Sequence, residues 1–332
     1  MKNAENKDKK MRKISRYISV LLILILVLPT LLLTSCDLNS NSNKISIICS
    51  TFAQYDFTMN ILGEASDKFD VAYLLESGID MHSYSNSISV SDKVKILSSD
   101  LFICIGGSSE KWIGELLLDD DAKEMKVLKL IDCVGELVCD DSDSHKNHDH
   151  SNADECDEHI WLSPKRAIMM CDAICKEICD LDNENAEIYA ENNTEYKEKL
   201  EKLDNDIENT ITSAKTDHII FADRFPFVYL TNDYGIGYSA VFDGCSAETN
   251  ATYETVVSLV KDINEKNIKV LITLEKSKTD IADTLIAESG RADMSVMSVI
   301  SMQNVSKKDI DNGMTYISVM YENLEILGKA MN

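Results

Sequence analysis

Short apolar runs alternate with longer segments of helical periodicity along the chain beyond residue 44. Runs of about four to eight β-branched and apolar residues between turn-forming residues are typical of strands. Eight such runs fall into two groups of four, at 44–52, 69–76, 100–107 and 126–132, and at 218–224, 237–244, 268–275 and 293–300. Several are apolar almost without interruption, which predicts parallel sheets covered by helices on both faces.

A long amphipathic segment separates the two groups of strands. Residues 182–214 contain neither Gly nor Pro, and Asp182 or Asn183 can serve as the N-cap. Apolar side chains recur at helical spacing at Tyr189, Tyr196, Leu200, Leu203, Ile207 and Ile211. The pattern predicts one helix of roughly 45 Å, at about 1.5 Å per residue, and two shorter helices with a break are the alternative.

These elements predict an α/β fold with two lobes, each holding a four-stranded, mainly parallel sheet flanked by helices, joined by one long backbone helix. The expected boundaries are 45–181 for the N-terminal lobe, 182–214 for the linking helix and 215–332 for the C-terminal lobe. Within the first lobe, residues 140–158 have no apolar period and are rich in Asp and Glu. We expect this acidic segment to be a loop.

The chain begins with a basic stretch followed by an apolar one. Seven Lys or Arg within residues 2–16 precede an uncharged run at 18–33, in the order of a secretory signal peptide. The run ends in Leu33-Thr34-Ser35-Cys36, which predicts a lipoprotein signal peptide at 1–35 and acylation of Cys36. Residues 36–44, rich in Asn and Ser, are then a flexible tether. The expected location is extracytoplasmic, lipid-anchored to the cell membrane; an uncleaved anchor is the alternative.

Net charge excludes one class of partner. The chain carries a formal charge of −24 at pH 7. Loss of residues 1–35 removes seven basic and two acidic side chains, a net loss of five positive charges, so the formal charge goes from −24 to −29. We expect a protein this acidic to bind no nucleic acid, because its field repels phosphates.

Cysteine usage predicts at least one free thiol. Nine cysteines follow Cys36, and an odd number cannot all pair within one chain. Cys171, Cys175 and Cys179 recur every four residues on one helical face. We expect them to pack as small apolar side chains, with a metal or redox role as the alternative.

Two histidines are candidate metal ligands. His82 follows the predicted strand at 69–76, and His159 precedes a helix that Ser163 and Pro164 can start. In open α/β sheets ligands bind beyond the carboxyl ends of the strands, so we expect both imidazoles at one edge. Each has a carboxylate one or two residues away, which can orient the ring on a zinc, manganese or iron ion.

Several segments resemble the solute-binding lipoproteins of zinc and manganese ABC transporters, over nearly the whole mature chain. The matching segments are Thr51-Phe52-Ala53-Gln54-Tyr55-Asp56, Gly78 to Tyr84, Asp100-Leu101-Phe102 with Gly106-Gly107, Glu158-His159-Ile160-Trp161-Leu162, Asp223-Arg224-Phe225-Pro226-Phe227, Gly244 to Thr249, and Gly313-Met314-Thr315-Tyr316. The order and spacing of these segments together carry the resemblance. The Asp-Arg-Phe-Pro-Phe segment is similar to one branch of the family in particular.

The resemblance implies two α/β lobes, a rigid linking helix, and a metal ion held in the cleft by a pair of groups from each lobe. It makes His82 and His159 the first-lobe ligands, and Zn²⁺ or Mn²⁺ the transported ligand. The implied partners are an ABC permease and its ATPase, and we expect a monomer. Zinc-type members commonly carry an acidic insertion with histidines, which here are His145, His148 and His150. This loop is either a low-affinity metal collector or a solvated insertion without a role.

The second-lobe ligands depart from the family pattern. The usual third ligand, His or Glu, falls on Arg224, which cannot bind a cation because its guanidinium stays protonated. The usual fourth falls near residues 300–302, which supply no ligand. The nearest substitutes are Glu275, Asp223, the neutral Gln303 and Asp56. For Glu275 and Asp223, the alternative is that they contact the ligating residues and do not bind the ion themselves.

The leading interpretation is an extracytoplasmic lipoprotein that binds zinc, or next manganese, and delivers it to an ABC importer. A scaffold or adhesion lipoprotein with a degenerate metal site is the alternative, because the second-lobe ligand positions are replaced. A metal-dependent hydrolase is a weaker alternative, since the sequence holds no His-Glu-x-x-His and no nucleophile-elbow pattern. We therefore expect the protein not to be an enzyme.

Overall fold

The computed structural model describes residues 44–84, 88–118, 125–139, 156–242, 244 and 251–332. Within these ranges Ile45–Asn332 forms one compact unit. None of the helices in the described ranges combines the length and the hydrophobicity needed to span a bilayer. The predicted signal peptide, Cys36 and the histidines of the acidic segment lie outside the described residues.

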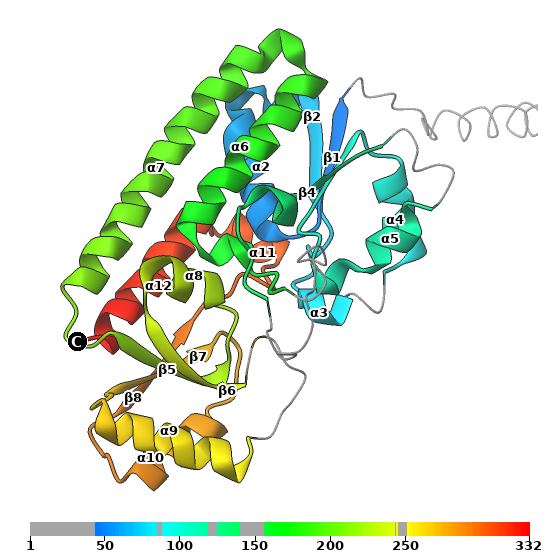
Figure 1. Cartoon of the computed structure of the whole chain (residues 1–332). Helices are drawn as coiled ribbons and strands as arrows, with labels where there is room; N and C mark the ends of the chain where they lie inside the picture. The colour runs from blue at the N-terminus through cyan, green and yellow to red at the C-terminus, as the bar shows by residue number, and fades with distance from the viewer. Residues whose placement is uncertain (1–43, 85–87, 119–124, 140–155, 243, 245–250) are drawn as a thin grey trace, which may run out of the picture. The chain divides into compact units, whose positions relative to one another are not determined.

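Two four-stranded sheets form the framework of this unit (Figure 1). The strands are β1 (Ile45–Cys49), β2 (Phe69–Tyr73), β3 (Leu101–Cys104) and β4 (Lys126–Lys129), then β5 (His218–Arg224), β6 (Gly237–Phe242), β7 (Val270–Leu274) and β8 (Ser295–Val299). The strand order is β2-β1-β3-β4 in the first sheet and β6-β5-β7-β8 in the second, so one arrangement occurs twice. All neighbouring strands are parallel. Each strand lies within its predicted segment, and the predicted fold class is confirmed.

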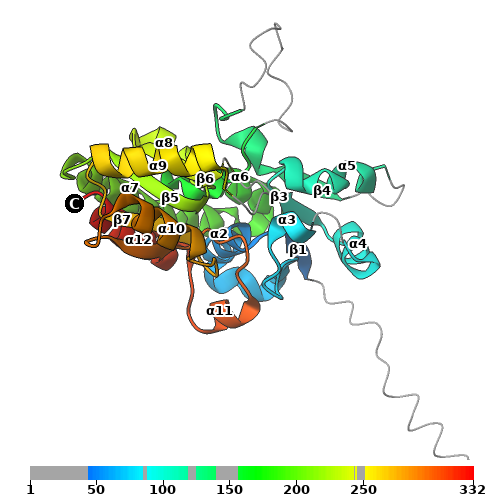
Figure 2. The ribbon, with the colours of Figure 1, turned by 90° about the horizontal axis from the view of Figure 1, so that it is seen from below.

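Helices cover both faces of each sheet. They are α2 (Phe52–Leu62), α3 (Met81–Tyr84), α4 (Val90–Leu97), α5 (Trp112–Leu116), α6 (Pro164–Leu181), α7 (Ala186–Thr212), α8 (Val228–Tyr234), α9 (Tyr253–Glu265), α10 (Asp280–Ser289), α11 (Lys307–Asp311) and α12 (Tyr316–Ala330). Helices α4 and α5 cover the outer face of the first sheet, and α9 and α10 cover that of the second (Figure 2).

The inner faces of the two sheets share one apolar core. Because side chains alternate along a strand, Ile47 of β1 and Phe221 of β5 point into this core while their neighbours Ile48 and Ile220 face the outer helices. Helices α2, α6, α7 and α12 fill the space between, and Phe57 of α2 contacts Tyr316 of α12 with ring centroids 4.8 Å apart. We refer to the two sheets with their helices as the first and second lobes.

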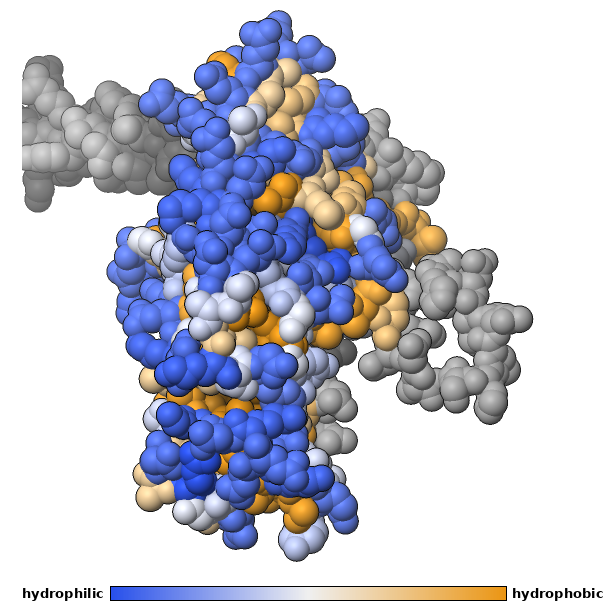
Figure 3. All heavy atoms as spheres, turned by 60° about the vertical axis from the view of Figure 1, so that its left-hand side comes forward, coloured by the Kyte–Doolittle hydropathy of each residue, from blue (hydrophilic) through white to orange (hydrophobic). Residues whose placement is uncertain are grey.

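The predicted linking helix exists as α7, 27 residues without a break, so the two-helix alternative is wrong. It begins at Ala186 rather than at Asp182. The Asp182 carboxylate accepts hydrogen bonds at 2.7 Å from Asn185 Nδ2 and from Tyr189 OH, and a short 3-10 turn separates it from α7. The predicted apolar stripe is buried as far as Ile207, and the opposite side belongs to a largely hydrophilic face (Figure 3).

Helices α6 and α8 join the lobes through a buried ion pair. Arg166 of α6 donates to both carboxylate oxygens of Asp233 in α8, at 2.9 and 3.0 Å. The Arg166 guanidinium lies 4.2 Å from the ring centroid of Tyr229, and the Ser163 hydroxyl donates to Asp233 at 2.6 Å. Through Tyr229 and Asp233, these contacts hold α8 against the first lobe.

The described residues include both free cysteines, as predicted, and one disulfide. Cys139 and Cys156 form a disulfide. The free cysteines among the described residues are Cys49, Cys104, Cys133, Cys171, Cys175 and Cys179. On α6, Cys171 and Cys175 are buried, as expected for apolar packing, whereas Cys179 is half-buried with its Sγ 3.9 Å from that of Cys175.

Candidate metal centre

The structure brings the two predicted first-lobe histidines together. His82 lies in α3, and His159 directly precedes the 3-10 turn Ile160–Leu162 that leads into α6. Their Nε2 atoms are 3.3 Å apart. Two nitrogens bound to one tetrahedral zinc ion at about 2.0–2.1 Å lie roughly 3.3–3.4 Å apart. The imidazoles therefore already have the separation of neighbouring ligands of one ion.

Two successive carboxylates, Asp157 and Glu158, lie against the other ring nitrogens. Asp157 Oδ1 is 2.9 Å from His159 Nδ1 and also accepts the backbone N–H of His159 at 2.8 Å. His82 Nδ1 lies 2.6 Å from Ser109 Oγ and 3.3 Å from Glu158 Oε1. A neutral ring that donates its Nδ1–H to such acceptors presents the Nε2 lone pair to a metal.

Ser109 connects Glu158 to His82. Its backbone N–H donates to Glu158 Oε2 at 2.9 Å, and its hydroxyl donates to Oε1. Gly107, close by in the same loop after β3, has to lack a side chain, because a Cβ there would overlap the Glu158 side chain. Sequence reasoning missed Ser109, although its loop follows a parallel strand at the edge where ligands bind.

Burial and charge favour a cation at this pair. The exposed fraction is 2% for His159 and 3% for Glu158. Burial by itself raises the pKa of Glu158, but the hydrogen bond with His82, the charge of His159 and the hydrogen bonds from Ser109 outweigh it and lower the pKa to about 2. Glu158 is therefore an anion next to the His82 ring, and its charge would compensate positive charge on an ion held by the two imidazoles.

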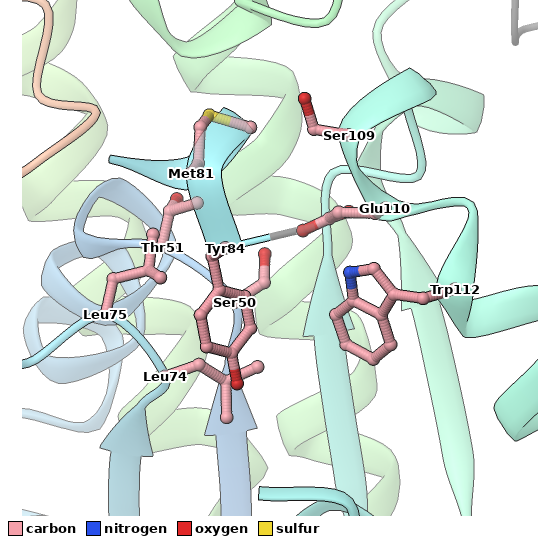
Figure 4. A pocket seen from close by; sticks show the side chains of 9 residues that line it. All are labelled: Ser50, Thr51, Leu74, Leu75, Met81, Tyr84, Ser109, Glu110 and Trp112. Atoms are coloured by element: carbon pink, nitrogen blue, oxygen red, sulfur yellow. The ribbon is translucent and has the colours of Figure 1, made fainter. Parts of the chain in front are cut away.

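A second buried carboxylate lies in a small pocket next to Ser109 (Figure 4). The pocket, about 10 Å³, is lined by Met81, Tyr84, Glu110 and Trp112 among others. Such a volume holds about one water molecule. Burial raises the pKa of Glu110 to about 7, against hydrogen bonds from the Gly106 N–H and from Ser50. Glu110 is thus close to its titration midpoint at neutral pH.

The two tentative second-lobe ligands are engaged with their own lobe. Glu275, directly after β7, accepts hydrogen bonds from Ser301 N at 2.9 Å and from Ser301 Oγ at 2.7 Å. Asp223 at the end of β5 accepts from Leu274 N at 3.0 Å and from its neighbour Arg224 N at 2.8 Å. Among the residues that the structure describes, no group of three or more His, Cys, Asp or Glu is placed to hold one ion. Their role as ligands stays a prediction.

The other substitutes considered from sequence lie in different surroundings. Asp56 is buried in α2, where its carboxylate accepts from Tyr196 OH of α7 at 3.0 Å. Gln303 is 2% exposed, in the turn after β8. In the same turn, buried Met302 has φ of 62°, a left-handed conformation that is unusual and strained for a side-chain residue. The turn after β8 is thus held in a costly conformation at Met302.

A chain of contacts joins the first-lobe histidines to the second lobe. The Trp161 ring lies 5.3 Å, centroid to centroid, from that of His159. Trp161 Nε1 donates to the Ser301 carbonyl at 2.9 Å, and the Trp161 carbonyl accepts from Tyr316 OH at 2.7 Å. Ser301 in turn binds Glu275. Two residues, Trp161 and Ser301, therefore connect the imidazole pair to the Glu275 carboxylate.

Two parallel α/β lobes, a long linking helix and paired imidazoles at the edge of the first sheet define a class: two-lobed binding proteins with a candidate transition-metal site. The family model described as zinc-uptake complex component A, periplasmic, matches residues 47–330. The chain belongs to this family, which confirms the resemblance expected from sequence.

Individual relatives agree with the family assignment. The zinc-binding lipoprotein AdcA of Streptococcus pneumoniae is 26% identical over 312 residues, 92% of this chain and 60% of the relative. The high-affinity zinc uptake system protein ZnuA of Bacillus subtilis is 28% identical over 297 residues, 89% and 90% of the two chains. The Zn(II)-bound ZnuA-like domain of S. pneumoniae AdcA matches with a TM-score of 0.69 at 25% identity, covering 87% of this chain and 99% of that domain. The chain spans a little over half the length of the streptococcal relatives.

Proposed function

We propose that this protein binds a divalent transition-metal ion outside the cytoplasm, zinc first and manganese next, and delivers it to an ABC permease and its ATPase. The metal is cargo, and we propose no enzymatic reaction. The observation that carries the proposal is the 3.3 Å separation of His82 Nε2 and His159 Nε2, with each Nδ1 held by a carboxylate or hydroxyl. The relatives named for zinc uptake make zinc the first candidate.

Capture and release follow from the same ligands. Neutral imidazole binds the ion, and protons compete for the same nitrogen, so acidification favours release. Glu275 and Asp223 remain the candidate second-lobe ligands. For Glu275 to bind the ion it has to exchange its hydrogen bonds from Ser301 for the metal, which a modest tilt of the second lobe would allow.

Equilibrium titration of the purified protein with Zn²⁺ and with Mn²⁺, against a competing chelator, tests the proposal. His82→Ala and His159→Ala should each weaken zinc binding by more than about 100-fold, since loss of a direct ligand costs more than the 10–100-fold typical of an orienting partner. His218→Ala is the matched control, because His218 lies at the start of β5, hydrogen-bonded to Ser239.

Unchanged affinity in both histidine variants would rule out this site. A wild-type protein that takes up no metal would favour the scaffold or adhesion lipoprotein, and turnover of ester or phosphoester substrates would favour a hydrolase. Glu275→Gln and Asp223→Asn in the same titration separate a direct ligand, with a large loss, from a carboxylate that only supports its own lobe.

Two further parts of the proposal concern residues outside those described. We propose that Cys36 carries the lipid that keeps the protein near its permease, so that Cys36→Ala should release the protein from the membrane fraction. His145, His148 and His150 are proposed to collect metal near the site. Deletion of residues 140–154 without effect on uptake at limiting zinc would leave the segment as a solvated insertion.

A further inference from the structure

The Cys139–Cys156 disulfide lies at the base of the acidic segment, next to the residues that orient both histidines. Cys139 and Cys156 are also paired as an antiparallel β-bridge. Cys156 directly precedes Asp157 and Glu158. The disulfide thus fixes the main chain directly before Asp157 and Glu158, the two residues whose carboxylates contact the Nδ1 atoms of the histidines.

Hydrogen bonds next to the disulfide also hold the main chain of Asp157 in place. The Asp157 N–H donates to the Val138 carbonyl at 2.8 Å. Tyr229 OH donates to the Asp157 carbonyl at 2.6 Å and accepts from Val138 N–H at 3.4 Å. Tyr229 is fully buried, and its ring packs on the Arg166 guanidinium. The main chain of Asp157 is therefore fixed by the disulfide, by Val138 and by the second lobe.

We propose that the Cys139–Cys156 disulfide is a positioning pair for the metal site. By holding Asp157 and Glu158, it keeps His159 Nδ1 and, through Ser109, His82 Nδ1 in place, and so maintains the 3.3 Å separation of the Nε2 atoms. Without it, residues 139 and 156, which are 17 positions apart, lose the cross-link that restricts their relative positions. The inference rests on the proposed metal-binding function.

A staple that only stabilises the fold makes a different prediction. In that case removal of the disulfide would lower the unfolding temperature and leave the zinc affinity of the folded protein unchanged. If the disulfide is a positioning pair, its removal lowers the zinc affinity of protein that is still folded, through Asp157 and Glu158. Affinity and folding therefore have to be measured on the same samples.

The test compares Cys139→Ser/Cys156→Ser with wild type in the zinc titration, with circular dichroism to report folding. The double variant is used because a single substitution leaves a thiol that itself binds zinc. We expect about 10–100-fold weaker binding, the range typical of lost orienting partners. Cys133→Ser, which removes a free thiol of the same lobe, should bind zinc like wild type.

A double-mutant cycle identifies the route of the effect. Asp157→Asn alone should weaken zinc binding, and in that background removal of the disulfide should weaken binding less than it does in wild type, since only the route through Glu158 and Ser109 to His82 is left. Fully additive losses, or a disulfide-free protein that binds zinc as tightly as wild type, would overturn the inference. Failure of wild type itself to bind zinc would instead overturn the proposed function.

A second measurement covers the case in which the serine variant does not fold. The folded Cys133→Ser protein is reduced with a phosphine, which opens the disulfide to two thiols, and the released thiols are methylated so that they cannot bind zinc. The positioning role predicts the same loss of affinity in this material. Unchanged affinity with the disulfide opened would contradict it.

Discussion

Glu110 is a buried carboxyl group whose ionisation links stability to pH near neutrality. Its exposed fraction is 6%, and its oxygens accept from the Gly106 N–H and from Ser50, with no cation among these partners. Burial raises its pKa from 4.5 to about 7, so the folded state holds the proton between these values more tightly than the unfolded state does. The stability this provides is present below pH 4.5 and is lost as pH rises through about 7.

Glu110→Gln should remove this pH dependence. The free energy of unfolding of wild type should fall by on the order of 3 kcal/mol more than that of the variant between pH 5 and pH 8. Urea unfolding of metal-free protein at both pH values measures the difference. Asp56, whose pKa burial raises to about 6, titrates in both proteins and cancels. Glu115→Gln on the exposed side of α5 is the control, and a Glu110→Gln curve parallel to wild type would contradict the assignment.

At the scale of elements, the Arg166–Asp233 ion pair is one of several contacts that attach α8 to α6. The side chains of Arg166 and Asp233 are 8% and 14% exposed, so neither is fully solvated. Arg166 also donates to the carbonyls of Val134 and Glu136, which tie the loop before the acidic segment to the same point. Removal of either partner leaves a poorly solvated charge, which costs more than the pair itself contributes.

Asp233→Ala should therefore destabilise the protein by about 3–5 kcal/mol, measured by chemical unfolding. Arg166→Met/Asp233→Leu should recover most of this loss, because it removes both charges. Asp180→Ala is the matched control on α6, since the Lys176–Asp180 pair is 70% and 48% exposed and such pairs contribute about 0–1 kcal/mol. Equal effects of the buried and the exposed aspartate would show that burial of the pair is unimportant.

At the scale of the whole described unit, the two lobes share one core. The cluster that contains Ile47 of the first sheet also contains Phe221 of the second, and α7 packs against α2, α6 and α12. Neither lobe can lose this core without exposing apolar surface of the other. One face of the linking helix is thus part of the shared core, so the helix is not a flexible tether between independent domains.

Thermal unfolding of the purified protein should consequently show one main transition. Zinc at about 100 times its dissociation constant should stabilise the folded state by about 2.7 kcal/mol and move the whole transition upward. Calorimetry with and without zinc measures both effects, and His82→Ala/His159→Ala is the control that should lose the zinc shift. Two well-separated transitions, of which zinc moves only one, would contradict the shared core.

Local patterns in the sequence were sufficient for much of the fold. Strand positions follow from apolar runs, and α7 follows from a helical stripe without Gly or Pro, because both signals lie within a few residues. The start of α7 differed because Asp182 binds the side chains of Asn185 and Tyr189, a preference that periodicity does not contain. His82 and His159 were found because parallel strands place their following loops at one edge.

The sequence by itself thus determined the two-lobed α/β fold and the histidine pair, since these depend on local periodicity, strand ends and family segments. Only the tertiary structure decided that Ser109 links Glu158 to His82, that Cys139 pairs with Cys156, and that Glu275 binds Ser301. These contacts join residues far apart in the chain, and neither residue of such a pair carries a local signal for its partner. Nine cysteines allow many pairings, and the fold brings Cys139 and Cys156 together next to Asp157 and Glu158.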